Sequence, residues 1–153
     1  MNYTVKIFWK KILSEPFVDS RYSRAHTWSF DGGIEIAASA SPHVVPLPYS
    51  KENAVDPEEA FVASISSCHM LWFLSLAAAK KFVIESYEDR AEGILAKNER
   101  GDLAMTEVTL KPKVIFGGMN FPSAAEIDTL HHSAHEKCYI ASSIKTKITI
   151  IPS

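Results

Sequence analysis

Cys68 and Cys138 are the only cysteines of this 153-residue chain, and they carry its most reactive side chains. They form no CxxC motif, so they could be two buried thiols, half of a metal site or a redox pair. A cysteine attacks as its thiolate, which a nearby cation or a helix N-terminus favours. Cys68 lies about three turns inside a predicted helix, too far from the positive end of the helix dipole. It therefore needs an arginine, a lysine or a protonated histidine from elsewhere.

The stretch that carries Cys68, residues 56–80, predicts one long helix. Asp56 suits the N-cap, Pro57 suits the first helical position, and Glu59 completes a capping box. No formally charged residue occurs from residue 60 to residue 79, which matches the ~20 residues of a bilayer span. The serines and the histidine within this run argue against a membrane span. We therefore expect a helix that is buried on nearly all sides.

The bulk composition is that of an ordinary globular protein, with 46% hydrophobic and 22% charged residues. The length suggests a single domain over residues 1–153. A net charge of -2 gives no reason to expect nucleic acid or an anionic membrane as a partner. The N-terminal residues lack the apolar core of a signal peptide, so we expect a cytoplasmic protein, a setting in which structural disulfides are rare.

The remaining pattern predicts an α+β fold. Alternating apolar residues and turn signals place three strands before the long helix, then two strands, a second helix and a last strand. In chain order the expected elements are strands 3–10, 24–30 and 34–38, helix 56–80, strands 83–97 and 103–116, helix 122–138 and strand 144–151. The proline-rich segment 41–55 is too apolar for disorder, so we expect an ordered loop packed against something.

His131, His135 and Cys138 form a second constellation, because they share a ~60° sector of one helix face. Two imidazoles and a thiolate are reasonable zinc ligands. Ile127 and Leu130 lie on the same face, however, and a fourth ligand is not obvious. A metal site and a plain core stripe both fit this pattern.

Glu58 and Arg24 are the remaining charged candidates. Glu58 precedes Cys68 by ten residues, a rise of about 15 Å, so the two cannot touch within one helix. If two copies of the helix pack antiparallel about a twofold axis, Glu58 of one chain could approach Cys68 of the other. Taken alone, Glu58 could simply complement the helix dipole, and Arg24 could form a surface ion pair.

Five stretches carry a family resemblance, and they are RAHTWSFDGG, VDPEEAFVASISSCHMLWFLSLAA, ESYEDRAEG, MTEVTLKPKVIF and LHHSAHEKCYIASSIKT. From about residue 24 to residue 150 the chain resembles the osmotically inducible protein C / organic hydroperoxide resistance (OsmC/Ohr) family, in its OsmC-like branch. The resemblance implies a thiol-dependent peroxidase that acts on organic hydroperoxides. It also implies an intertwined homodimer with two sites at the interface.

The resemblance also implies roles for single residues. Cys68 matches the peroxidatic cysteine, Cys138 the resolving cysteine and Glu58 the acid of the family. Arg24 matches the arginine best by its distance from the Asp31-Gly32 turn, with Arg21 as the fallback. The family uses no bound cofactor, and the implied reductant is an external dithiol resembling dihydrolipoamide on a lipoyl-carrying protein.

Two other functions stay open at this point. The chain could be a small-molecule binding protein that keeps the fold without turnover, or a metal-dependent enzyme built on the His/Cys constellation. The candidates for an apolar substrate pocket are Val44, Val45, Leu47, Tyr49, Phe61 and Trp72. For His69, His131, His132 and His135 we expect structural roles or tuning of the thiols.

Overall fold

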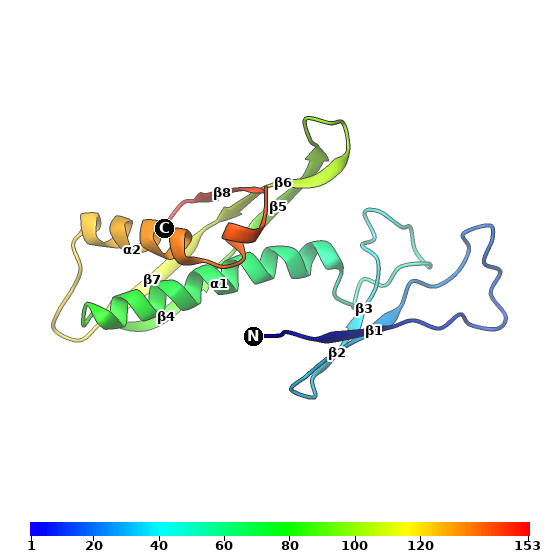
Figure 1. Cartoon of the computed structure of the whole chain (residues 1–153), viewed down its shortest axis with the longest axis horizontal. Helices are drawn as coiled ribbons and strands as arrows, with labels where there is room; N and C mark the ends of the chain where they lie inside the picture. The colour runs from blue at the N-terminus through cyan, green and yellow to red at the C-terminus, as the bar shows by residue number, and fades with distance from the viewer. The chain divides into compact units, whose positions relative to one another are not determined.

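The computed structural model describes all residues, 1–153, and confirms the α+β class (Figure 1). Its elements are β1 (Val5–Phe8), β2 (His26–Phe30), β3 (Glu35–Ala38), α1 (Pro57–Ala79), β4 (Val83–Asp89), β5 (Glu92–Lys97), β6 (Leu103–Leu110), β7 (Pro112–Gly117), α2 (Ala124–Lys137), the 3-10 turn η1 (Ala141–Ser143) and β8 (Lys147–Ile150). The chain divides into two compact units, which we call unit 1 (Met1–Ala60) and unit 2 (Phe61–Ser153). The single domain over 1–153 stays a prediction.

Unit 1 contains an antiparallel sheet in the order β1-β2-β3. The predicted hairpin turn at Asp31-Gly32-Gly33 joins β2 to β3, and Gly33 adopts φ 82°, which glycine tolerates best. One prediction is wrong in detail: the strand begins at His26, so Arg24 lies in the preceding loop instead of on a strand face. Its backbone N–H donates to the carbonyl of Tyr49 at 2.8 Å, which ties this loop to the proline-rich segment.

The proline-rich segment 41–55 is ordered, as expected. Val55 at its end pairs with Ala38: the Val55 N–H donates to the carbonyl of Ala37, and the Ser39 N–H donates to the carbonyl of Val55, both at 3.0 Å. The segment buries serines more than apolar groups, since Ser41 and Ser50 are buried while Val44 and Leu47 are more than half exposed. Within this chain, the expected packing of its apolar residues is therefore not found for Val44 and Leu47.

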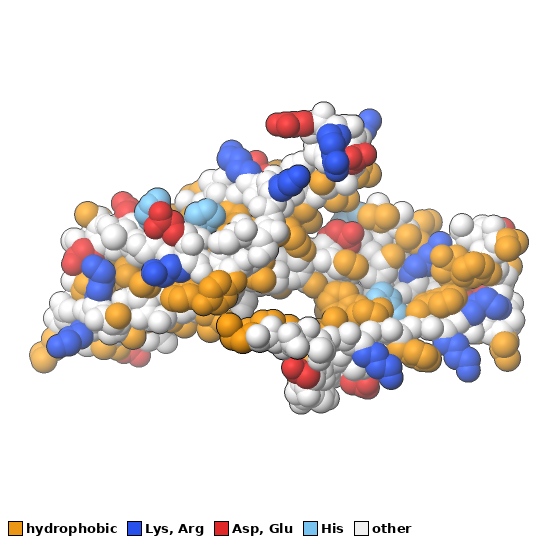
Figure 2. All heavy atoms as spheres, viewed as in Figure 1, with side chains coloured by type: hydrophobic (Ala, Val, Ile, Leu, Met, Phe, Trp, Pro, Cys, Tyr) orange, Lys and Arg blue, Asp and Glu red, His pale blue; other side chains and the backbone are white.

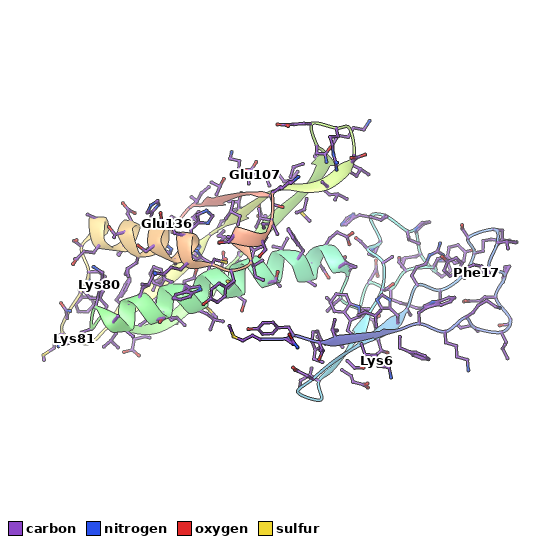
Figure 3. The ribbon with its side chains drawn as sticks, in the orientation of Figure 1. Lys6, Phe17, Lys80, Lys81, Glu107 and Glu136 are labelled. Carbon is purple, nitrogen blue, oxygen red and sulfur yellow. The ribbon has the colours of Figure 1, made fainter.

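Both ends of α1 follow from local sequence. Asp56 accepts from the backbone N–H of Glu59 at 2.8 Å, and the Glu59 carboxylate accepts in return from the N–H of Asp56, which completes the predicted capping box. At the other end Lys81 adopts φ 62° and Phe82 donates its N–H to the carbonyl of Ala77, the pattern of a Schellman motif. Figure 3 shows Lys80 and Lys81 where the helix ends.

The expectation that α1 is buried on nearly all sides is wrong for this chain. Only one stripe at four-residue spacing is buried, formed by Ile65, His69, Phe73 and Ala77. The opposite stripe is exposed, with Leu71 at 60%. By length and composition α1 could cross a bilayer, but the core helix of a soluble domain passes the same test. The apolar composition of α1 therefore exceeds what one chain covers.

Unit 2 holds a β4-β7 ribbon and a β5-β6-β8 sheet in which β8 runs parallel to β6. We predicted two long strands here, and the structure divides each of them into two. The break lies where the Asp89 carboxylate accepts from the N–H of Lys111 at 2.6 Å and from the Ser66 hydroxyl. These bonds anchor the ends of β4 and β6 to α1, so the ladder does not continue past them.

The core of unit 2 consists of two clusters on either end of the α1 stripe. The first joins Phe73 and Ala77 of α1 to Leu130 and Ala134 of α2, and the second joins Ile65 to the β-sheet. Helix α2 begins at Ala124, two residues after the predicted start, because Ser123 forms a capping box with Glu126. Figure 2 shows apolar side chains that remain at the surface of both units.

Candidate functional site

The two cysteines come together in unit 2. Cys68 lies on α1 and is half-buried, whereas Cys138 is 1% exposed and caps the C-terminal end of α2. Neither is in a disulfide, and the Cys68 thiol lies close enough to Cys138 to raise the pKa of the Cys138 thiol. The two cysteines that the family resemblance pairs thus lie close together within one chain.

The surroundings of the two thiols differ. Burial raises the pKa of the Cys138 thiol to about 11, and its contact with Cys68 adds to the shift. The backbone N–H of Ala141 points at the Cys138 sulfur at 3.3 Å and opposes this shift only in part. Cys138 is therefore a neutral thiol at pH 7. Buried thiols of this kind are inert toward outside reagents, whereas a partly exposed thiol such as Cys68 can meet a substrate.

A buried histidine pair lies beside the cysteines, and sequence reasoning did not find it. His69 follows Cys68 on α1, and its Nε2 lies 3.0 Å from Nδ1 of His131 on α2. Burial lowers the pKa of both imidazoles to about 4, so both are neutral at pH 7. The signal in the sequence was that each cysteine helix carries a histidine, His69 directly after Cys68 and His131 seven residues before Cys138, but only the fold shows that the two histidines touch.

The other histidines of α2 are not hydrogen-bonded to this pair, although His135 lies near enough to contribute to the lowered pKa of His69. His132 is exposed and lies 3.4 Å from the carboxylate of Glu136. His131, His135 and Cys138 do not converge, and no group of three or more His, Cys, Asp or Glu residues in the chain could hold a metal ion. The reason is that His131 turns toward α1, where it pairs with His69. The proposed zinc constellation is thus not supported by the geometry.

The two candidate arginines of unit 1 have different environments. Arg21 forms an exposed ion pair with Asp19 at 2.6 Å. Arg24 is half-buried, its guanidinium donates to the carbonyls of Ser20 and Tyr22, and it stacks 3.7 Å from the centroid of the Tyr22 ring. Since no carboxylate pairs with Arg24 in this chain, its charge is available to another anion.

Glu58 lies in the first turn of α1 and forms no ion pair with Arg24 in this chain. The two charged residues that the family resemblance assigns to the site therefore do not pair within one copy. Helix α1 is continuous between Glu58 and Cys68, as the argument from helix rise requires.

The apolar candidates do not form one pocket within unit 2. Phe61 lines an open cleft of about 840 Å³, together with the β5–β6 turn and residues 144–146. Trp72 instead packs edge-on against Tyr139, with ring centroids 5.6 Å apart. Neither Cys68 nor Cys138 lines the cleft. A substrate pocket at the thiols is therefore not formed by these residues of unit 2 alone.

Comparison with known proteins now gives the family. The OsmC-like protein family matches residues 50–153, which is most of the chain. The chain belongs to the OsmC-like family. This confirms the resemblance, and it places the α1 and α2 cysteines within the matched region. Comparison with curated proteins gave no match.

Solved structures of OsmC-like relatives have the same fold. An OsmC-like protein of unknown function from Vibrio cholerae is 52% identical, covers 100% of this chain and 99% of its own, and has a TM-score of 0.98. The organic hydroperoxide resistance protein OhrB of Bacillus subtilis is 16% identical, with 100% and 98% coverage and a TM-score of 0.71. An organic hydroperoxide resistance protein from Elizabethkingia anophelis is 17% identical, with 100% and 99% coverage and a TM-score of 0.67. At these low identities the two hydroperoxide resistance proteins show only that the fold is shared.

Proposed function

We propose that this OsmC-like protein is a thiol-dependent peroxidase that reduces organic hydroperoxides to alcohols. The observation that carries the proposal is the proximity of a half-buried thiol, Cys68, to a fully buried one, Cys138. A partly exposed thiol can meet a peroxide, while a neutral buried thiol next to it is protected until the first one is oxidised. This asymmetry supports Cys68 as the peroxidatic cysteine and Cys138 as the resolving cysteine.

The chemistry balances with these two residues and an external dithiol. The Cys68 thiolate attacks the distal oxygen of the hydroperoxide, the O–O bond breaks, and the alkoxide leaves as the alcohol after it takes up a proton. The Cys138 sulfur then displaces the hydroxyl of the Cys68 sulfenic acid. The S–S bond forms, and the hydroxyl leaves with the thiol proton as water. An external dithiol, dihydrolipoamide or a lipoyl-carrying protein, reduces the disulfide by exchange.

Arg24 is the residue that we propose to hold the Cys68 thiolate and to donate to the peroxide oxygens. Its guanidinium has no carboxylate partner in this chain, in contrast to Arg21. Glu58 would pair with Arg24 and fix its orientation. Because no such pair exists within one copy, we propose that a second copy of the chain completes the site.

Two uncovered surfaces support a homodimer. The outer stripe of α1 is exposed and contains alanine, serine and Leu71, which permit close helix packing. Strand β1 exposes Val5 and Ile7 at 53% and 55%. Soluble monomers seldom leave contiguous apolar surface of this kind open to water.

The test counts thiols. Reduced protein should lose both free thiols after one equivalent of an organic hydroperoxide and regain them with dihydrolipoamide. Cys68→Ser should abolish hydroperoxide consumption, because no other thiol can reach the substrate. Cys138→Ser should still consume one equivalent and stop as a sulfenic acid, which dimedone traps. Unchanged hydroperoxide consumption by Cys68→Ser would refute the peroxidase and leave the binding function without turnover.

A further inference from the structure

A side-chain hydrogen bond between His69 and His131 joins α1 to α2. The imidazoles are 1% and 4% exposed, and their ring planes are within 4° of each other. The ring of His131 also packs 4.3 Å from that of Phe73, inside the cluster that joins the two helices. A directional polar contact is thus embedded in an otherwise apolar helix interface.

Two apolar side chains would fill this space without the cost of removing imidazoles from water. The cost is visible at the far end of the pair, where Nε2 of His131 is buried and has no hydrogen-bond partner. The pair therefore contributes less to stability than an apolar replacement of the same shape could. The hydrogen bond instead fixes the distance between α1 and α2 and their rotation relative to each other, because its geometry is directional.

The same two helices carry the two thiols. His69 is adjacent to Cys68 on α1, and His131 precedes Cys138 by seven residues, which is two turns of the same helix face. Fixing the rotation of α1 at His69 also fixes the direction of Cys68. Fixing α2 at His131 likewise sets where its C-terminal cap, Cys138, comes to lie.

We propose that the His69–His131 hydrogen bond is a positioning clamp that holds Cys138 against Cys68 for disulfide formation. The proposal rests on the peroxidase function and deepens it. In the step concerned, the Cys138 sulfur attacks the Cys68 sulfenic sulfur, the S–O bond breaks, and the hydroxyl and the thiol proton leave as water. Because both imidazoles are buried, at 1% and 4% exposed, the clamp is expected to act in this second step and not in the attack on the peroxide.

The atoms of the bond allow a matched set of variants. His131 uses Nδ1, whose position the amide of asparagine can take, and His69 uses Nε2, whose position the amide of glutamine can take. His131→Asn and His69→Gln therefore retain the bond, whereas His131→Leu removes it. His69→Leu/His131→Leu removes both polar groups and leaves no buried imidazole unpaired. His132→Leu is the control, because His132 is exposed on the same helix.

The experiment mixes reduced, full-length protein with one equivalent of cumene hydroperoxide and follows two rates. Hydroperoxide consumption reports the first step, and the loss of both thiols to a maleimide quench reports the second. We expect His131→Leu and the double leucine variant to form the disulfide about tenfold more slowly, from the loss of one hydrogen bond in a directed contact. Hydroperoxide consumption should be unchanged, and dimedone should trap more Cys68 sulfenic acid. His131→Asn should recover most of the rate, and His132→Leu should match the wild type.

Three outcomes would overturn the clamp. These are a wild-type rate of disulfide formation in the double leucine variant, equal slowing by His131→Asn and His131→Leu, or parallel slowing of both steps, which would indicate a general loss of structure. Failure of the peroxidase function is read separately, since wild-type thiols would then survive cumene hydroperoxide. In that case the variants can still be compared by the rate at which diamide, which oxidises two neighbouring thiols to a disulfide, forms the Cys68–Cys138 disulfide.

Discussion

The two units of this OsmC-like chain differ in how many hydrophobic side chains they bury. Unit 2 encloses two hydrophobic clusters around one stripe of α1. Unit 1 buries a single hydrophobic residue, Ala38, and its other buried side chains are polar. A unit of this size with almost no core cannot offset the conformational entropy that its folding costs. Unit 1 therefore needs apolar contacts from outside itself to be stable, whereas unit 2 has its own hydrophobic core.

The residues of the proposed site are also divided between the two units. Unit 2 contains the two cysteines and the His69–His131 pair, and unit 1 contains Arg24 and Glu58, the two charged residues that we propose for the site. In unit 1 the local order around Arg24 comes from an aromatic cluster, in which Trp9, Phe17 and Tyr22 pack with ring centroids 4.6 to 5.9 Å apart. Unit 1, which has almost no core, thus holds the Arg24 guanidinium in a defined position.

The prediction with the largest expected effect tests whether a second chain covers the apolar face of β1, by placing a charged side chain on that face. If a second chain covers this face, Ile7→Asp places a carboxylate in a desolvated interface at a cost of several kcal/mol. We expect the mass in solution to fall from twice 17.0 kDa to 17.0 kDa, with loss of most peroxidase activity. Multi-angle light scattering at micromolar concentration checks this. Val18→Asp is the control, because Val18 is 98% exposed in a loop. An unchanged mass for Ile7→Asp would show that β1 is not covered by a partner.

A second prediction compares the two arginines of unit 1. Arg24→Met should lower kcat/KM for an organic hydroperoxide about a hundredfold, the size of effect expected when one charged donor to a reacting oxygen is removed. Arg21→Met should have little effect, because Arg21 is exposed and already paired with Asp19. Steady-state kinetics with dihydrolipoamide measures both variants. Similar losses in the two would exclude a specific role for Arg24.

The third prediction concerns stability instead of activity, namely how the histidine pair of unit 2 makes stability depend on pH. Burial lowers the pKa of His69 and His131 from 6.5 to about 4, so the unfolded chain binds protons before the folded one does. Their contribution to the free energy of unfolding is complete above pH 6.5 and falls as the pH drops toward 4. At ~1.4 kcal/mol for each unit of pKa, the loss amounts to a few kcal/mol.

Urea unfolding at pH 7.5, 5.5 and 4.5 measures this decline. The matched control is the variant His69→Leu/His131→Leu, which should lose much less stability over the same interval. An equal decline in both proteins would mean that carboxylates elsewhere, such as Asp89 and Asp128 near the pair, account for the acid sensitivity.

Local sequence was sufficient wherever the interaction spans only a few residues. The capping box of α1, the Asp31-Gly32-Gly33 turn and the alternation of the hairpin strands were all predictable, because each depends on neighbours in the chain. The division of the two long strands was not predictable. It depends on Asp89 meeting Lys111, a contact between residues far apart in the sequence.

The sequence by itself determined the family, the α+β class, and the two cysteines on separate helical segments. It also established that Glu58 and Cys68 are too far apart to meet along one helix, since helix rise is a local property. Only the tertiary structure decided that Cys68 touches Cys138, that His131 turns to His69 instead of a metal, and that one face of α1 is left open. These outcomes depend on how two helices pack across 62 or more residues of chain, which no periodicity in either helix specifies.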